Sequence, residues 1–372
     1  MHPTVYLDSG FFKDGMPAGW LEPGRHVRVT DASQLIESLQ SLESMQRAGA
    51  WVVVALAYEA GWVLMDLPAR LKPRHQPDIW LDAWVFEADP EPIVLGESES
   101  DAFPAWCEAD HAVYVKALNQ VREAIASGVC YQVNQTFQLL GTSSIDPWML
   151  YQTLIRHQPA DYGGFIDWPG RQILSRSPEL FVKKRGDWLR SEPMKGTAPR
   201  SGDPARDAEI LKTLLADPKM HAENLMIVDL IRNDLSRVAE AGSVSVPTLF
   251  ESRPLKSVHQ VSSVVEARMK PDQSIVDILR ALFPCGSVVG APKAKAFELI
   301  QALEIAPRGI YTGSVGVLEP DGDFTWSVAI RTLDQRGDTV QLGLGSGVVA
   351  DSETEAEWTE CLLKGRFAGV GI

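Results

Sequence analysis

A single lysine, Lys195, lies in the turn-like segment SEPMKGTAPRSGD (residues 191–203), between apolar and small residues. A lysine in such a segment is most often solvated, because lysine side chains are seldom buried. A lysine that is desolvated or placed beside another cation can instead have a lowered pKa, and its uncharged amine is then a nucleophile. The segment by itself leaves both interpretations open.

One glutamate, Glu223, falls on the apolar face of the helix predicted in ADPKMHAENLMIVDLIRNDL. Asp217 is a good N-cap for this helix, and Pro218 suits its first position. The apolar stripe on the same face consists of Met226, Ile227, Leu230 and Ile231. A buried carboxylate costs several kcal/mol unless something pairs with it. The alternative is a glutamate that is favoured by the dipole at a helix N-terminus.

A second acidic helix is predicted near the C-terminus, in ADSETEAEWTECLLKGR. Ser352 and Glu355 have the spacing of a capping box, which would explain why an acidic residue stands at position 355. Glu357 and Glu360 lack such an explanation, since like charges at i and i+3 repel, and Lys364 continues their face one turn on. With the glutamate of the earlier helix, they form a set of oxygen donors suited to a hard divalent cation such as Mg²⁺. A solvated acidic surface helix is the alternative.

Glycines recur in the strand-like run GLGSGVVAD, at Gly343, Gly345 and Gly347. Glycine weakens a strand, so its repetition indicates that another group approaches the backbone closely. Backbone N–H groups followed by a helix N-terminus are suited to hold a carboxylate. A second glycine-rich turn, at residues 284–300, lacks the spacing of a phosphate-binding loop, and no GxGxxG run occurs. The sequence therefore gives little support to nucleotide binding.

The elements that must position these groups are short strands separated by single helices. Strand-like runs dominate, and residues 311–333 are a predicted hairpin with EPDGD as its turn. Helices are expected at residues 113–127, 208–239, 274–282, 292–303 and 352–364. Because the order lacks regular βαβ alternation, the pattern favours an α+β fold built on antiparallel sheets.

A chain of 372 residues is long enough for two domains or for one large one. The acidic, proline-containing stretch 87–105 is the best candidate for a linker, although it could equally be a surface loop inside one domain. It separates a small N-terminal portion from a larger portion that holds all the candidate residues.

The net charge of −14 argues against a general nucleic-acid or anionic-membrane binder, because both need basic patches. The four cysteines lack CxxC spacing and are expected to be reduced thiols rather than a disulfide or zinc framework. No apolar run approaches the ~20 residues of a membrane span, and the N-terminal residues lack the pattern of a signal peptide. We therefore expect a soluble cytoplasmic protein with no nucleic-acid and no membrane partner.

These candidate residues lie in strings that resemble the chorismate-utilising enzyme family, which includes anthranilate, aminodeoxychorismate, isochorismate and salicylate synthases. The matching strings are LSRSPELF, PMKGTAPR, AENLMIVDLIRNDLSRV, VHQVSSVVEA, GSVVGAPKAKAFELI, YTGSVGV, WSVAIRTL and GSGVVADSETEAEWTECLLK. They occur in the family's order and cover residues 115–365, whereas the N-terminal third matches weakly, through ALAYEAGW. We therefore predict that residues 1–105 are a divergent N-terminal portion of the same fold and that residues 106–372 are the chorismate-binding catalytic core.

The resemblance implies an α+β fold with two packed, mainly antiparallel β-sheets and surrounding helices. It implies that Glu223, Glu357 and Glu360 hold Mg²⁺, which would explain how an acidic protein receives the dianion chorismate. Tyr311 and Arg331 would hold the enolpyruvyl carboxylate, since arginine suits a bidentate contact with a carboxylate. The other substrate-binding residues implied by the family pattern are Thr197, Ser287, Gly347 and Lys364.

Lys195 separates the members of this family, because anthranilate synthases usually carry alanine at this place and aminodeoxychorismate synthases carry lysine. The resemblance implies that the amine attacks C2 of chorismate as the C4 hydroxyl leaves. Ammonia then adds at C4 and expels the lysine, which yields 4-amino-4-deoxychorismate for p-aminobenzoate and folate synthesis. Glu179 matches the family's general acid–base position, and His259 is expected near the departing hydroxyl. No cysteine lies in a nucleophile-elbow context, so we expect ammonia from a separate glutamine amidotransferase subunit.

The alternatives left open are anthranilate synthase, isochorismate synthase and a non-catalytic chorismate-binding subunit. A subunit without activity often loses one of the catalytic residues, and here Lys195, Glu179 and the three glutamates are all present. The chain departs from the family's pattern at Ala198, where relatives often have arginine, and at Met220, where they often have an acidic residue. Cys285 replaces a common glycine, and we interpret it as a small buried thiol.

Overall fold

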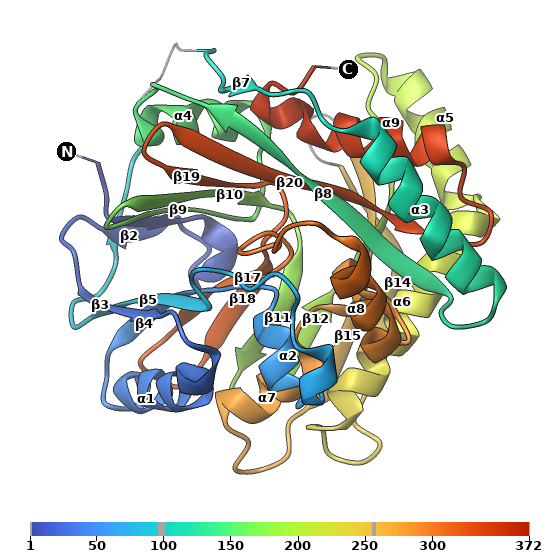
Figure 1. Cartoon of the computed structure of the whole chain (residues 1–372). Helices are drawn as coiled ribbons and strands as arrows, with labels where there is room; N and C mark the ends of the chain where they lie inside the picture. Colours follow the sequence, from blue (N-terminus) through green and yellow to red (C-terminus); the bar gives the residue numbers. More distant parts are fainter. Residues whose placement is uncertain (1, 96–100, 255–257, 372) are drawn as a thin grey trace.

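The computed structural model describes residues 2–95, 101–254 and 258–371, and Figure 1 shows two large β-sheets with helices around them. The first sheet consists, in spatial order, of β16 (Gly290–Ala291), β8 (Gln132–Thr142), β20 (Thr339–Val348), β19 (Thr332–Arg336), β10 (Arg171–Ser177), β9 (Tyr162–Trp168), β1 (Val5–Leu7), β2 (Ala18–Trp20) and β6 (Glu91–Pro92), with β7 (Ala105–Trp106) paired to β8.

The second sheet consists, in spatial order, of β13 (Met194–Pro199), β15 (Val258–Arg268), β12 (Trp188–Glu192), β11 (Leu180–Arg185), β18 (Phe324–Val328), β17 (Ser314–Leu318), β4 (Trp51–Leu56), β5 (Leu81–Phe86) and β3 (Arg25–Val29), with β14 (Ser245–Pro254) paired to β15. The strand pairs of both sheets are antiparallel.

The α-helices are α1 (Leu35–Arg47), α2 (Ala60–Leu64), α3 (His111–Ala126), α4 (Pro147–His157), α5 (Pro204–Leu215), α6 (Pro218–Ser236), α7 (Ile275–Leu282), α8 (Lys293–Leu303) and α9 (Thr354–Gly365). Short 3₁₀ turns occur at Ser9–Phe11, Ala32–Gln34, Ala69–Leu71, Gly286–Val288 and Arg366–Ala368.

Three hydrophobic clusters hold these layers together. One lies between the sheets and joins Val5 and Ile166 of the first sheet to Val53 and Val315 of the second. A second cluster packs α1, α2, α6 and α7 on strands of the second sheet. The third packs α3, α4, α8 and α9 on strands of the first sheet. The predicted α+β fold with two packed antiparallel sheets is therefore confirmed.

Local sequence signals predicted several boundaries correctly. The hairpin expected in residues 311–333 is formed by β17 and β18, which meet at the EPDGD turn. The helical run expected over 208–239 is broken into α5 and α6, and the Asp217 side chain caps α6 by accepting from the Lys219 N–H. Helices α1, α2 and α4 were not predicted.

The predicted capping box at the start of α9 is wrong. The helix begins at Thr354, and its N-cap residue, Glu353, makes no side-chain cap. The Ser352 hydroxyl instead donates to Oε1 of Glu357 at 2.6 Å, and Glu355 lies 3.1 Å from the ring of His111. Ser352 therefore holds one of the candidate metal ligands rather than the helix end.

The first 92 residues contribute strands to both sheets: β1, β2 and β6 to the first, and β3, β4 and β5 to the second. The division of the chain at residue 105 stays a prediction. Across the described residues, no helix combines the length and hydrophobicity that a bilayer crossing needs. The four cysteines are free thiols, as expected, and three of them are buried.

A buried ion-pair network ties the two sheets together. Arg171 of β10 donates to both carboxylate oxygens of Asp334 of β19 at 2.8 Å and to Asp82 of β5 at 3.2 Å. Asp82 is fully buried and also pairs with Arg28. Because Arg171 bridges strands of different sheets, it fixes how the sheets face one another.

Replacing Arg171 with leucine is expected to lower the free energy of unfolding by about 3–5 kcal/mol, because removing one partner leaves buried carboxylates uncompensated. Urea denaturation would measure the change. The matched control is Arg232→Leu, since Arg232 forms an exposed pair with Asp229. Such surface pairs contribute about 1 kcal/mol or less. Equal losses of unfolding free energy in the two variants would show that Arg171 does not stabilise the packing of the two sheets.

Candidate active site

Lys195 lies at a bulge in β13, and its amine reaches towards the first sheet. The pairing of β13 with β15 shifts register between Met194 and Thr197, and Gly196 has a φ of +89°. A β-carbon added at Gly347 of β20 would come within 3.1 Å of the Lys195 amine nitrogen. The side chain is half-buried, so it does not extend into bulk solvent as a loop lysine would.

Glu179 lies between β10 and β11 and is buried beside this amine. Its Oε1 accepts a hydrogen bond of 2.7 Å from Ser287 Oγ. Burial raises the pKa of Glu179 to about 7, although the Ser287 hydrogen bond and the charge of Lys195 act in the opposite direction. A carboxyl group with this pKa is partly protonated near neutral pH, as a general acid must be. Ser287, which the resemblance implies is a substrate ligand, is a partner of Glu179 here.

The three candidate metal ligands lie on α6 and α9. Burial raises the pKa of Glu223, and the charges of Glu360 and Glu357 add to this effect while Lys195 and Lys219 oppose it. Burial also works to raise the pKa of Glu360, but the charge and hydrogen bond of Lys364 hold it below its usual value. The three carboxylates therefore lie close enough to influence one another and Lys195.

This donor set fits Mg²⁺ in its chemistry. All three groups are carboxylates, which are ligands that Mg²⁺ prefers, and the ion usually keeps several waters. Within residues 2–95, 101–254 and 258–371, however, no three His, Cys, Asp or Glu side chains form a ready-made metal cage. Glu223, Glu357 and Glu360 could thus hold a partly hydrated ion, whose remaining ligands would be water and substrate.

Arg331 is a half-buried cation with one guanidinium nitrogen that no described residue pairs with. It has a φ of +51°, and its Nη1 is buried without a hydrogen-bond partner among the described residues. Burial lowers the pKa of Arg331 to about 10. A buried guanidinium nitrogen without a partner is costly, and a carboxylate could supply it with a bidentate contact. The position fits the predicted role in holding a substrate carboxylate.

The glycines of β20 make room for neighbouring side chains, as their repetition predicted. The Tyr311 ring lies directly against Gly343, where any β-carbon would overlap it. Lys364 donates from its amine to the Gly345 carbonyl at 2.9 Å and lies 2.7 Å from Glu360. Tyr311, Lys364 and Lys195 therefore all lie against the glycines of this one interior strand.

His259 is the predicted site residue that the structure connects least directly to this group. It is buried on β15, and its Nε2 lies 3.1 Å from Oδ1 of Asp207 on α5. Its predicted place near a departing hydroxyl stays a prediction. The side chain of Thr197 lies outside the described part of the structure, so its predicted role also stays a prediction.

Comparison with known protein families gives this arrangement its context. The sequence profile of the family described as chorismate binding enzyme matches residues 85–368. The chain belongs to this family. The match covers every predicted site residue, from Glu179 to Lys364.

Curated relatives of this chorismate binding enzyme include two kinds of synthase. Aminodeoxychorismate synthase component 1 from Klebsiella aerogenes is 40% identical over 282 residues, which are 76% of this chain and 62% of the relative. The protein of that name from Escherichia coli K12 is 41% identical over 68% of this chain and 55% of the relative. An anthranilate synthase component 1 from Haloarcula marismortui is 36% identical over 70% of this chain and 52% of the relative. The chain spans less than two thirds of the length of these relatives.

Solved structures resemble this chorismate binding enzyme over nearly its whole length. An isochorismate synthase from Bacillus anthracis has a TM-score of 0.78 at 24% identity and covers 99% of this chain and 96% of its own. Anthranilate synthase component I from Streptococcus pneumoniae has a TM-score of 0.78 at 22% identity, and the match covers 99% of this chain and 91% of the other. These likenesses support the fold.

Sequence reasoning missed one polar residue of the chorismate binding enzyme's site, Gln132. Its side chain is fully buried, and neither its Nε2 nor its Oε1 has a hydrogen-bond partner among the described residues. A β-carbon added at Gly347 would lie 2.8 Å from its Nε2, so the amide and Lys195 flank the same glycine. The available signal was a run of polar residues in a buried strand, Gln132, Asn134, Gln135 and Thr136.

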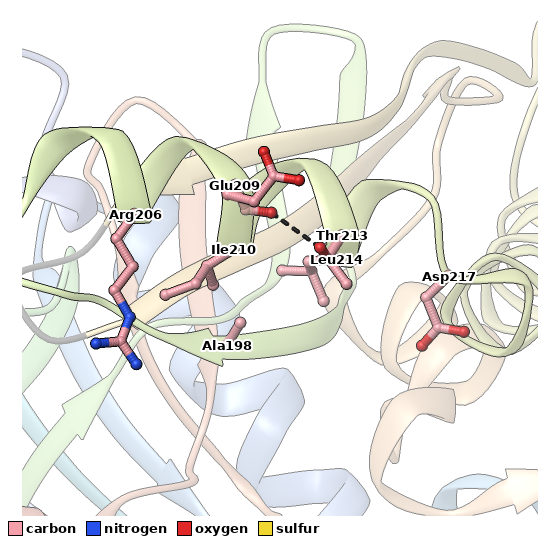
Figure 2. A pocket seen from close by; sticks show the side chains of 7 residues that line it. All are labelled: Ala198, Arg206, Glu209, Ile210, Thr213, Leu214 and Asp217. Carbon is pink, nitrogen blue, oxygen red and sulfur yellow. Dashed lines mark hydrogen bonds between the residues drawn. The ribbon is translucent and has the colours of Figure 1, made fainter.

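The structure shows the surroundings of the three residues that depart from the family pattern. Met220 is buried against Gly196, where an added β-carbon would lie 2.5 Å from its Cγ. Cys285 is the buried thiol predicted, and burial raises its pKa to about 12. Ala198 borders a groove of about 520 Å³ between β13 and α5, which Figure 2 shows with Ile210 and Leu214 on its helical side.

Replacing Gly347 with alanine is expected to lower chorismate turnover by about 10- to 100-fold, because the new methyl group displaces Gln132 and Lys195 and small misplacements are costly in active sites. Turnover assays would be paired with thermal denaturation, which should change little. Gly202→Ala is the matched control, since a β-carbon there meets nothing within 4 Å. Full activity in Gly347→Ala would contradict the placement of these two groups.

Proposed function

We propose that this protein converts chorismate and ammonia to 4-amino-4-deoxychorismate in the cytoplasm, with Lys195 as covalent nucleophile. The observation that carries the proposal is the setting of the lysine amine. It lies against Gly347, and its charge acts on buried Glu179 and also on Glu223 and Glu360. This combination brings an amine, a candidate general acid and a candidate cation site close together.

In the first step, the uncharged amine of Lys195 forms a bond to C2 of chorismate. The ring double bond shifts, and the bond from C4 to its hydroxyl oxygen breaks. Hydroxide is a poor leaving group, so the protonated carboxyl of Glu179 gives its proton to this oxygen, which leaves as water. Glu179 is then a carboxylate, and the Ser287 hydroxyl that donates to Oε1 stabilises it.

In the second step, ammonia attacks C4, the double bond shifts back, and the bond from C2 to the lysine nitrogen breaks. The Glu179 carboxylate takes the proton that the ammonia nitrogen loses. Lysine and glutamate return to their starting states, and the net reaction exchanges a hydroxyl for an amino group with release of water. Arg331 and Tyr311 hold the enolpyruvyl carboxylate through both steps.

When bound by Glu223, Glu357 and Glu360, Mg²⁺ would neutralise and anchor the ring carboxylate of the substrate. The residues themselves would keep that carboxylate next to Lys195, with Lys364 and the backbone at Gly347 beside it. This arrangement would let a chain of net charge −14 receive a dianion.

Ammonia would come from a separate glutamine amidotransferase subunit. The two relatives named as component 1 support a second component, and the present sequence carries no nucleophile-elbow cysteine of its own. The product would feed the synthesis of p-aminobenzoate and folate.

The product of the reaction tests this proposal. The protein would be incubated with chorismate, Mg²⁺ and ammonium, and the product would be identified by its mass and ultraviolet spectrum. 4-Amino-4-deoxychorismate is expected, whereas anthranilate or isochorismate alone would assign the protein to another activity. No turnover at all would support a non-catalytic chorismate-binding subunit. Omission of Mg²⁺ tests the metal separately.

A further inference from the structure

Helix α5 is attached to the protein through a buried carboxylate. Within its twelve residues, all of which are described, Asp207 is the one that is buried. Its oxygens accept hydrogen bonds of 2.8 Å from the Ser201 N–H and from Arg200 Nε, and Oδ1 lies 3.1 Å from Nε2 of His259. The apolar residues Ile210 and Leu214 border the groove of Figure 2 instead. The carboxylate therefore joins α5, the end of β13 and β15.

His259 lies on the face of the second sheet that meets α5. It is directly opposite Ala198 in the β13–β15 ladder, and residues opposite each other share a face of the sheet. Ala198 borders the groove along α5 and is three residues beyond Lys195. The imidazole thus lies on the strand that pairs with the lysine-bearing strand, close to the bulge at Lys195.

The chemistry of this contact determines where the imidazole carries its proton. An ionised carboxylate only accepts hydrogen bonds, so the ring nitrogen that faces it must be the donor. The Ser201 N–H and Arg200 Nε both donate to Asp207, which keeps the group ionised and holds its pKa below the usual value. In this structure Nε2 meets Asp207 as a close contact of 3.1 Å without the alignment of a full hydrogen bond, whereas Nδ1 is buried with no polar partner among the described residues.

We propose that Asp207 is a positioning residue of the active site, which holds the His259 imidazole with its proton on Nε2 and leaves Nδ1 as a hydrogen-bond acceptor for the substrate. The inference deepens the proposed function and rests on it. The C4 hydroxyl of chorismate would donate its hydrogen to Nδ1. Its oxygen lone pair would then face the proton of Glu179, so the two groups together orient the departing oxygen.

The bland explanation is that Asp207 merely anchors α5. The two roles predict different results, because an anchor acts on the whole helix whereas a positioning residue acts through His259. Asp203→Ala provides the matched control: it removes the side chain that caps the same helix by accepting from the Ala205 N–H, and it leaves the carboxylate at 207 in place.

The first measurement is the tautomer of His259, read from long-range ¹H–¹⁵N spectra of the full chain with labelled histidine and assigned with His259→Gln. The wild-type ring is expected to carry its proton on Nε2, and this preference should be lost in Asp207→Asn but kept in Asp203→Ala. A wild-type ring with its proton on Nδ1, or an unchanged tautomer in Asp207→Asn, would overturn the proposal. This arm needs no turnover and stands whether or not the proposed product forms.

The second measurement is a kinetic double-mutant cycle on chorismate turnover. Asp207→Asn is expected to lower kcat by about 10- to 100-fold, which is less than the ~10²- to 10⁴-fold of a direct proton-transfer group because Asp207 acts only through His259. KM should stay within about 3-fold of wild type, since the substrate carboxylates are held elsewhere. In the His259→Gln background the same change should cost less than about 2-fold, because the residue it acts through is gone.

An equal loss in both backgrounds, or an equal loss in Asp203→Ala, would assign Asp207 to helix anchoring and overturn the proposal. Failure of the proposed function would show itself differently, as a wild-type protein that forms another product or none while the tautomer result remains.

Discussion

Replacement of Lys195 with alanine is expected to lower the rate of 4-amino-4-deoxychorismate formation by at least about 10³-fold, because loss of a covalent nucleophile removes the whole reaction path through it. The physical reason lies in the position of the amine, whose charge acts on the buried acid Glu179 and on Glu223 of α6 and Glu360 of α9. Chorismate consumption and product mass measure the effect.

The control for this variant is Lys212→Ala, which removes an exposed lysine from the neighbouring helix α5 and should leave turnover unchanged. Intact-protein mass spectrometry after acid quenching of the wild type with chorismate and no ammonium should reveal an adduct that Lys195→Ala lacks. Unchanged turnover in Lys195→Ala would exclude lysine nucleophilic catalysis, whichever product is formed.

Replacement of Glu179 with glutamine is expected to lower kcat by about 10²- to 10⁴-fold, the usual contribution of a positioned acid or base. Glutamine keeps the shape and can accept from Ser287, but it cannot give a proton to the leaving oxygen. Steady-state assays measure the loss. The matched control is Glu209→Gln on the exposed side of α5, which should keep wild-type activity.

The pH dependence of the wild type should report the same carboxyl group. Burial raises the pKa of Glu179 to about 7, so the acid form is present below that pH and kcat should fall as pH rises through it. The raised folded-state pKa also affects stability, because between pH 4.5 and 7 the folded protein binds the proton more tightly than the unfolded chain does.

The stabilisation that comes from this proton is fully present below pH 4.5 and is lost as pH rises through 7. Glutamine cannot ionise, so the Glu179→Gln variant should not lose this stabilisation. Its free energy of unfolding relative to that of the wild type should therefore rise between pH 4.5 and pH 8. Denaturation at pH 4.5 and pH 8 measures the difference. Parallel pH profiles for the two proteins would show that Glu179 does not titrate in this range.

Features that depend on near neighbours in the chain were predictable. The EPDGD turn between β17 and β18 and the Asp217 cap of α6 were predicted from residues only a few positions apart. The glycines of β20 were correctly interpreted as places of close approach, because a strand tolerates such repetition only where something lies against it. The prediction of a capping box at Ser352 was wrong although the spacing was right, because the Ser352 hydroxyl donates to Glu357 instead of capping the helix.

Features that depend on strands far apart in sequence were decided only by the tertiary structure. Pairing between β13 and β15 creates the bulge at Lys195, and packing of the sheets brings its amine to Gly347, more than 150 residues away in the chain. The contact of Ser287 with Glu179 has no local signature, and the polar run around Gln132 does not show that its amide lacks a partner among the described residues. Both exist because burial removes competing water, and sequence patterns do not encode which buried groups meet.

The amino-acid sequence alone determined which groups this protein can use: an amine, a candidate general acid, three further carboxylates and a guanidinium, in strings that identified the fold class. The tertiary structure decided their relations, including the link from Asp207 to His259 and the raised pKa of Glu179. The physical reason is that residue type sets the chemistry a side chain can do. Burial and the charges around it set its protonation, and both arise only when distant segments pack together.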